Sequence, residues 1–204
     1  MISTLHYISQ QTATASHVDN IRAACDAGCR WIQLRIKEGP ESLITNAALA
    51  ARAICDRYGA TLIINDHPHI AKATGAHGVH VGKNDMTVAA ARQIVGEELI
   101  VGGTSNTLED ILQHVKDGAD YVGLGPFRFT ITKQKLSPIL GLEGIKEIMQ
   151  ELSARNINIP VIAIGGILEE DVPAILQTGV HGIAVSGLIT HAANKKQTIL
   201  SITT

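Results

Sequence analysis

Short apolar runs rich in β-branched residues recur along the chain, and each is followed by a stretch with apolar residues three and four positions apart. The first pattern predicts a buried strand, and the second predicts a helix that buries one face. We expect eight strands, at residues 4–9, 31–36, 61–65, 78–82, 99–104, 120–125, 160–166 and 182–186. The apolar content comes from Ile, Val, Leu and Ala, with only 3% aromatic residues, which suits parallel strands covered by helices.

Regular alternation of strand and helix predicts a parallel sheet, and eight such units close naturally into a (β/α)8 or TIM barrel. We expect residues 1–204 to form one domain. Glycines precede four of the strands at similar places, which fits internal repetition, although any loop between a helix and a strand favours glycine. They are Gly28, Gly75, Gly118 and Gly179. An open doubly wound sheet is the alternative, but the first strand lacks the GxGxxG that follows it in dinucleotide-binding folds.

The charge pattern excludes several classes of function. The net charge is −2, and no lysine or arginine run provides the basic surface that nucleic-acid binding requires. The amino terminus lacks the pattern of a signal peptide, and no stretch of about 18 apolar residues is uninterrupted. We therefore expect a cytoplasmic protein that binds neither nucleic acid nor membranes.

Cysteines and histidines do not form a metal-binding motif. Cys25, Cys29 and Cys55 are too few for a disulfide framework and are expected to be buried. Four histidines lie within residues 64–85, but none are spaced four apart as in a helical zinc site. These histidines are His67, His69, His77 and His80. We expect His80, inside a predicted strand, to be a hydrogen-bonded interior residue.

The carboxyl ends of the strands carry the chemistry in barrels of this kind. Gln33, Arg35 and Lys37 end the second strand, and their alternation directs them to one face. Two cations and an amide at the barrel mouth predict a phosphate or diphosphate site. The alternative is a solvated strand end at which Glu38 is the local partner.

Two aspartates end the third and fourth strands. Asp66 and Asp85 each follow an asparagine, and neighbouring strands would bring their carboxylates together. Such a pair beside a diphosphate suits Mg²⁺, whose other ligands are waters and substrate oxygens. Taken alone, each aspartate would more commonly cap a helix. Together with the cations of the second strand, they favour the metal site.

Further phosphate-binding groups are expected after the sixth, seventh and eighth strands. The long connection after the sixth strand is predicted to be a ligand clamp rather than merely a flexible loop. The last two strand ends correspond to the phosphate site of many barrels, where glycines admit the anion to backbone N–H groups. The residues expected to contribute are Thr130, Thr132, Lys133, Gly165, Gly166, Ser186 and Gly187.

The motifs as a set resemble the thiamine-phosphate synthase family over nearly the whole chain. They are QLRIK at 33–37, ND at 65–66, GVHVGKND at 78–85, GGTSNT at 102–107, GLGPFRFTITK at 123–133, PVIAIGGI at 160–167 and GIAVSGLI at 182–189. The resemblance implies a barrel enzyme that joins a pyrimidine alcohol diphosphate to a thiazole alcohol phosphate. Diphosphate would leave with the assistance of Mg²⁺.

The resemblance also implies roles for individual residues. The pyrimidine diphosphate would be held by Gln33, Leu34, Arg35, Ile36, Lys37, Asn65, Thr104 and Lys133. The thiazole phosphate would be held by Thr130, Ile131, Thr132, Gly166, Ser186 and Gly187. Mg²⁺ would be bound by Asp66 and Asp85, while Arg35, Lys37 and Lys133 would stabilise the departing diphosphate and so act catalytically.

The chain departs from the family pattern at several positions, and two alternatives stay open. The departures are Ile36, His67, Lys83, Thr104, Asn106, Phe129 and Gly187. A thiazole tautomerase would place its proton-transfer histidine at Asn106, and a non-catalytic barrel would only bind a phosphorylated metabolite. Retention of Asp66, Asp85 and Lys133 favours the synthase. The first and last helical layers are expected to be thin, which leaves room for a partner or a homo-oligomer.

Overall fold

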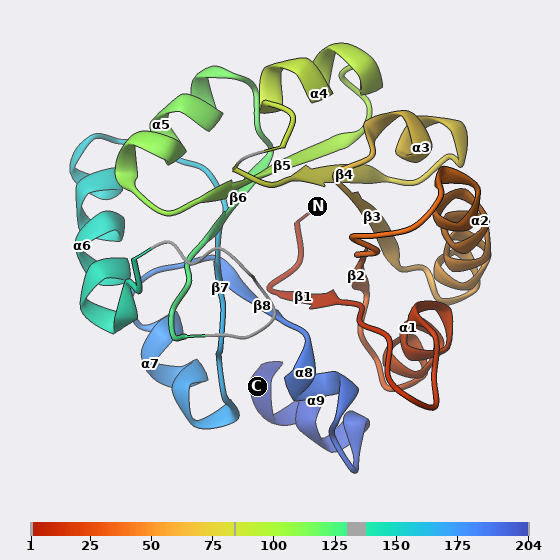
Figure 1. Ribbon diagram of the computed structural model, residues 1–204. Coiled ribbons are helices and arrows are strands. Elements are labelled where there is room, and N and C mark those ends of the chain that lie inside the picture. Colours follow the sequence, from red (N-terminus) through yellow and green to blue (C-terminus); the bar gives the residue numbers. More distant parts are fainter. Residues whose placement is uncertain (1, 84, 130–137, 204) are drawn as a thin grey trace.

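The computed structural model describes residues 2–83, 85–129 and 138–203. Within them, eight parallel strands form a closed barrel in which each strand pairs with the next and β8 pairs with β1 (Figure 1). The strands are β1 Leu5–Ile8, β2 Trp31–Leu34, β3 Thr61–Asn65, β4 Gly78–Val81, β5 Ile100–Ser105, β6 Tyr121–Leu124, β7 Val161–Ile164 and β8 Gly182–Val185. The predicted (β/α)8 barrel is confirmed.

The helices form a ring outside the barrel (Figure 1). They are α1 His17–Asp26, α2 Glu41–Tyr58, α3 Pro68–Ala73, α4 Val88–Val95, α5 Leu108–Lys116, α6 Gly141–Ala154, α7 Val172–Leu176, α8 Gly187–Thr190 and α9 Lys195–Thr203. A short 3-10 helix, η1 Glu169–Asp171, leads into α7. Because β1 and β8 are neighbours, the first and last parts of the chain meet beside the same wall of the barrel.

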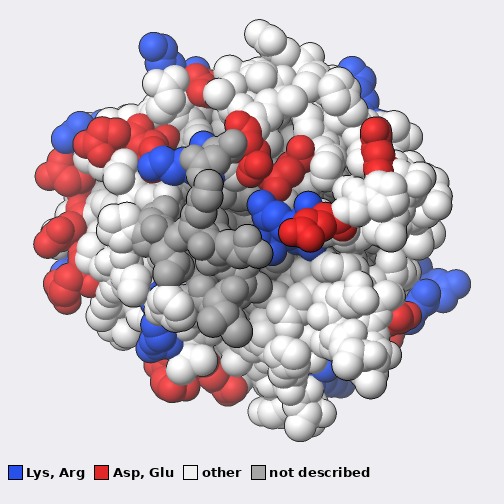
Figure 2. Space-filling model, in the orientation of Figure 1, with Lys and Arg blue, Asp and Glu red and all other residues white. Residues whose placement is uncertain are grey.

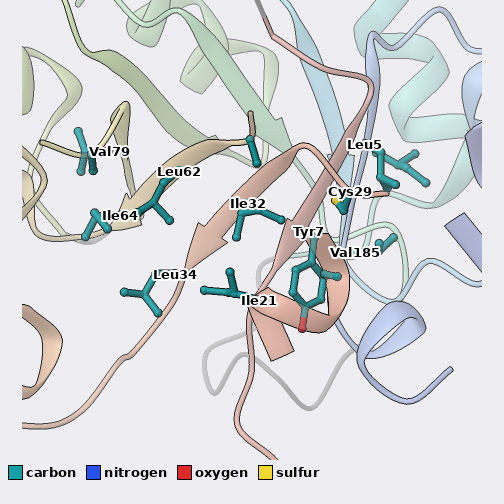
Figure 3. Close-up of a cluster of buried hydrophobic side chains, with 14 of the residues drawn as sticks. Leu5, Tyr7, Ile21, Cys29, Ile32, Leu34, Leu62, Ile64, Val79 and Val185 are labelled. Carbon is teal, nitrogen blue, oxygen red and sulfur yellow. The ribbon is translucent and has the colours of Figure 1, made fainter. Parts of the chain in front are cut away.

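Side chains alternate strictly across the barrel wall. Residues such as Ile32, Leu34 and Leu62 face outward and pack with helix residues in the layer drawn in Figure 3. The inward positions form a second cluster around Trp31, Ile63 and Tyr121. Since the period of a strand is two residues, the polar residue two positions after an inward apolar residue also faces inward. The inner cluster therefore forms the floor beneath the polar strand ends.

Side-chain caps fix where several helices begin. Ser16 and Asp19 form a reciprocal capping box at the start of α1, and Thr107 and Asp110 form another at α5. Thr87 caps α4.

The predicted alternative role of the two aspartates as helix caps is wrong. His67 precedes α3 without a side-chain capping bond, and Thr87 rather than Asp85 caps α4. Asp66 has a positive φ of 62° and directs its carboxylate to the backbone of Gly82. Both aspartates are thus available to the barrel mouth.

The cysteines behave as predicted, because all three are free and buried in the core. In the described part of the chain, no helix is both long enough and apolar enough to cross a membrane.

Gly182 tests how tightly the barrel is closed. A β-carbon built on Gly182 would lie 2.1 Å from the backbone oxygen of Thr4, so any side chain would push β8 away from β1. We expect Gly182→Ala to lower the free energy of unfolding by about 2 to 3 kcal/mol, measured by urea denaturation. The control is Gly144→Ala inside α6, where the nearest atom is 3.3 Å away and alanine favours the helix. Equal stability of both variants would contradict the tight closure.

Candidate functional site

A cavity of about 910 Å³ opens at the carboxyl ends of the strands. Residues from all eight strand ends line it, so it is the mouth of the barrel. Figure 2 shows basic and acidic side chains gathered near the centre of this face of the molecule. We call this cavity the mouth cavity.

The end of β2 supplies the predicted cations. Gln33, Arg35 and Lys37 all line the mouth cavity, as their alternation predicts. The Arg35 guanidinium makes no hydrogen bond or ion pair with any described residue. Burial lowers the pKa of Arg35, and the charges of Asp66 and Asp85 only partly offset this effect. A partly desolvated cation without a direct partner favours the binding of an anion.

Leu34 and Ile36 lie between these polar residues but face the other way. Both belong to the hydrophobic layer between the sheet and the helices. Their predicted contact with the pyrimidine diphosphate would therefore have to come from backbone groups.

Asp66 and Asp85 approach each other around Gly82. A β-carbon built on Gly82 would lie 2.2 Å from Asp85 Oδ2 and 3.6 Å from Asp66 Oδ1. The backbone N–H of Gly82 also donates to Asp66 Oδ1 over 3.1 Å. The absence of a side chain at Gly82 thus leaves room for both carboxylates, and the structure brings this predicted pair together.

Lys37 forms ion pairs with both carboxylates. Its ammonium lies 3.1 Å from Asp66 Oδ2 and 4.0 Å from Asp85 Oδ2, so these aspartates rather than Glu38 are the partners that the structure shows. Burial opposes the ionisation of Asp66, but the hydrogen bond and charge of Lys37, together with hydrogen bonds from the Gly82 N–H and Asp85, hold the pKa of Asp66 below its ordinary value. The wall formed by β2, β3 and β4 is therefore strongly polar.

Neutral hydrogen-bonding groups lie in the mouth cavity above the inner cluster. Gln33 Nε2 donates to Asn65 Oδ1 over 3.4 Å, and the Asn65 amide also donates to Asp66. His80 Nε2 lies 3.0 Å from the Thr104 hydroxyl oxygen, and His80 Nδ1 lies 3.0 Å from the Tyr121 hydroxyl oxygen. The predicted interior role of His80 is confirmed, and its ring fixes the position of Thr104.

The ends of β7 and β8 offer backbone donors instead of charges. Gly165 and Gly166 have positive φ values of 102° and 68°, which turn the chain around the rim. Gly166, Ile167, Gly187 and Leu188 line the mouth cavity, and their backbone N–H groups donate to no described residue. Such a set of unpaired N–H groups is suited to a phosphate.

The end of β1 also belongs to the site, although no function was predicted for it. Ser9, Gln10 and His17 line the mouth cavity. Ser186 donates its hydroxyl to Gln10 Oε1 over 3.1 Å, and Ser9 Oγ lies 2.9 Å from His17 Nδ1. The signal in the sequence is the polar run SQQ at 9–11, which begins at the last residue of a predicted strand.

The His17 imidazole lies close to Arg35. Burial and the Arg35 charge lower the pKa of His17, while the contact with Ser9 acts in the opposite direction. Ser9 Oγ also accepts the backbone N–H of Arg35 over 3.1 Å, which links the ends of β1 and β2.

The remaining predicted residues of the long connection lie outside the described residues. They are Thr130, Ile131, Thr132 and Lys133. Their roles stay predictions.

The fold places the chain in the class of (β/α)8 barrels, and the mouth cavity lies at the carboxyl ends of the strands, where enzymes of this class carry their active sites. Comparison with known proteins identifies the family. The family model described as thiamine monophosphate synthase matches residues 5–189. The chain belongs to the thiamine monophosphate synthase family.

Individual relatives agree with this assignment. A thiamine-phosphate synthase of Phocaeicola vulgatus is 50% identical over 188 residues, covering 92% of this chain and 90% of the relative. One of Flavobacterium johnsoniae is 50% identical over 196 residues, covering 96% and 92%. The solved thiamine phosphate pyrophosphorylase of Pyrococcus furiosus superposes with a TM-score of 0.84 at 31% identity, covering 98% of this chain and 93% of that one. The family resemblance predicted from the motifs is confirmed.

Arg35 provides a direct test of the anion site. We expect Arg35→Ala to weaken the binding of inorganic diphosphate roughly tenfold or more, because a charge-assisted contact is lost. Isothermal titration calorimetry of the two proteins measures this difference. The control is Arg155→Ala, since Arg155 pairs with Glu151 on α6 and does not line the mouth cavity. Equal affinities of wild type and Arg35→Ala would contradict this role for Arg35.

Proposed function

We propose that the chain catalyses the thiamine-phosphate synthase reaction in the mouth cavity. In this transfer, 4-amino-2-methyl-5-hydroxymethylpyrimidine diphosphate condenses with 4-methyl-5-(2-hydroxyethyl)thiazole phosphate, or with its carboxylated form. The products are thiamine phosphate and diphosphate. The observation that carries the proposal is that one cavity combines two sets of groups suited to anions, cations at β2 and backbone N–H groups without a described acceptor at β7 and β8.

The pyrimidine diphosphate is assigned to the wall formed by β2 to β5. Gln33, Asn65 and Thr104 present neutral donors and acceptors that suit the aminopyrimidine. Arg35 and Lys37 lie at the rim above them, where the diphosphate would extend. Lys133 is assigned to the same group by the family motif. The thiazole phosphate is assigned to Gly166, Ser186 and Gly187, together with Thr130, Ile131 and Thr132 of the motif.

The reaction is a dissociative substitution. The bond between the methylene carbon and the diphosphate oxygen breaks, and its electron pair leaves with the diphosphate. The aminopyrimidine stabilises the positive methylene carbon, while Arg35, Lys37 and Lys133 neutralise the charge that grows on the leaving group. The lone pair of the thiazole nitrogen then forms the new carbon–nitrogen bond. This nitrogen carries no proton, so the step needs no general base, and binding both substrates in one cavity supplies their orientation.

Mg²⁺ fits the carboxylates of Asp66 and Asp85. Among the described residues, no group of three or more His, Cys, Asp or Glu side chains is arranged to hold a metal ion. A site built on these two carboxylates would therefore need oxygen ligands from the substrate and from water, as Mg²⁺ commonly has. The space beside Gly82 accommodates both carboxylates. When bound there, Mg²⁺ would neutralise charge on the diphosphate.

The buried environment of Asn106 favours the synthase over a thiazole tautomerase. Asn106 lies at the position where the tautomerase would carry its histidine. Its amide Nδ2 donates to the backbone oxygen of Gly125, and its side chain is almost fully buried. An amide held in this way joins the ends of β5 and β6 and cannot transfer protons at neutral pH.

Location and assembly stay predictions from the sequence. We expect the enzyme to act in the cytoplasm and to need only its two phosphorylated substrates and Mg²⁺. A homo-oligomer is also compatible with this proposal.

The proposed reaction is tested by mixing the purified protein with both phosphorylated substrates and Mg²⁺. We expect thiamine phosphate to form and diphosphate to be released in equal amounts, measured by chromatography and by a coupled diphosphate assay. Omitting either substrate or adding EDTA should stop both signals. Absence of thiamine phosphate, together with tautomerisation of the thiazole carboxylate, would identify a tautomerase instead. Binding of the substrates without turnover would identify a non-catalytic barrel.

Asp85 tests the proposed metal site. We expect Asp85→Ala to lower turnover by roughly two orders of magnitude or more, because one of two protein ligands is lost. A titration of activity with Mg²⁺ should also show weaker apparent metal affinity. The matched control is His69→Ala, whose exposed side chain lies on α3 outside the mouth cavity and whose loss should leave activity unchanged. Wild-type turnover and Mg²⁺ dependence in Asp85→Ala would remove the metal assignment.

A further inference from the structure

Arg128 follows β6 and joins its end to the end of β7. The backbone N–H of Arg128 donates to the oxygen of Gly165 over 2.8 Å, and the N–H of Phe127 donates to the oxygen of Ile164 over 2.9 Å. The Arg128 side chain adds a further bond, from Nη1 to the oxygen of Gly166 over 2.9 Å. The backbone bonds alone already attach the two segments, so the side chain contributes something more specific.

The Arg128 guanidinium is fixed in orientation by Asp171. Nη1 and Nη2 donate to the two carboxylate oxygens over 2.8 Å and 2.9 Å, which is a bidentate ion pair. Asp171 Oδ2 also accepts the backbone N–H of Leu168 over 2.8 Å, and its side chain is only 13% exposed. The hydrogen bond from Arg128 holds the pKa of Asp171 below its ordinary value. A planar guanidinium held at both ends has little freedom to rotate.

This ion pair sets the direction of the peptide between Gly166 and Ile167. In a trans peptide, the C=O and the following N–H point in opposite directions. The Gly166 oxygen is turned toward Arg128, which does not line the mouth cavity, whereas Gly166 and Ile167 do. The Ile167 N–H is therefore on the side of the peptide away from Arg128. It donates to no other described residue.

We propose that Arg128 and Asp171 are positioning residues that hold the Ile167 N–H toward the phosphate of the thiazole substrate. This inference rests on the proposed function, which assigns that phosphate to the ends of β7 and β8. Gly166 has a positive φ of 68° and could rotate its peptide at low cost without the ion pair. The ion pair between Arg128 and Asp171, which we call the clamp, removes that freedom before the substrate binds. Less ordering of the backbone is then required on binding.

The test compares steady-state kinetics of wild type, Arg128→Ala, Arg128→Lys and Asp171→Asn. We expect Arg128→Ala to raise the KM for thiazole phosphate roughly tenfold, with little change in kcat or in the KM for the pyrimidine diphosphate. Arg128→Lys keeps the charge but cannot contact the carbonyl and both carboxylate oxygens, so its KM should be intermediate. Asp171→Asn should raise the same KM. The control is Arg155→Ala, which removes an exposed ion pair on α6.

Ser186→Ala separates failure of the clamp from failure of the phosphate site. A higher KM for thiazole phosphate in both Ser186→Ala and Arg128→Ala supports the clamp. If only Ser186→Ala raises this KM, the phosphate site stands and the clamp is overturned. If neither variant raises it, the phosphate lies elsewhere and both proposals fail.

The double variant Arg128→Ala with Asp171→Ala provides an independent readout. Residues that act as one unit lose their effect together, so the double variant should raise the KM for thiazole phosphate no more than either single variant. If the increases in KM for thiazole phosphate seen in the two single variants multiply in the double variant, the clamp is overturned. A fall in kcat with an equal rise in both KM values would indicate a general structural defect and would overturn it as well.

Discussion

Closure of the barrel by the pairing of β8 with β1 is the constraint on which the site depends. This pairing places β1 between β8 and β2, so the first and last parts of the chain contribute to one cavity. Gln10 then contacts Ser186, while Ser9 accepts the backbone N–H of Arg35. The end of β1 thereby connects the proposed phosphate site with the cationic site. An open sheet of the same strands would separate these groups.

The mouth cavity partly buries charged side chains, and neighbouring charges offset part of the free-energy cost of that burial. Burial alone would disfavour the ionised forms of both Arg35 and Asp66. Lys37 compensates the Asp66 carboxylate directly, whereas the Arg35 guanidinium has no direct partner among the described residues. An anionic substrate would complete this arrangement, since it supplies the partner that Arg35 lacks and a second partner for Lys37. The same groups that bind the diphosphate would then stabilise it as it leaves.

The sequence predicts the fold well, because strands and helices follow from local periodicity and the barrel follows from their number. It also identifies the strand ends that form the mouth, including Asp66 and Asp85. The sequence does not predict the side-chain contacts that join segments far apart along the chain. Arg128 and Asp171 are 43 positions apart, and Gln10 and Ser186 are 176 apart, so no local pattern marks either pair. Leu34 and Ile36 show a different limit of prediction from motifs. They belong to the motif at 33–37, but their side chains point away from the site because the strand alternates its side chains between two faces.

In the proposed function, the two ends of the mouth recognise anions by different means, and this difference bears on which substitutions the site would tolerate. The wall formed by β2 to β4 uses charged side chains, so the identity of Arg35, Lys37, Asp66 and Asp85 matters directly. The rim at β7 and β8 uses backbone N–H groups, which every residue except proline provides. Gly187, for example, provides a backbone donor although it has no side-chain hydroxyl. If this rim binds the phosphate as proposed, substitutions that disturb its backbone conformation, including those at Arg128 and Asp171, should therefore matter more there than changes of the side chains nearest the phosphate.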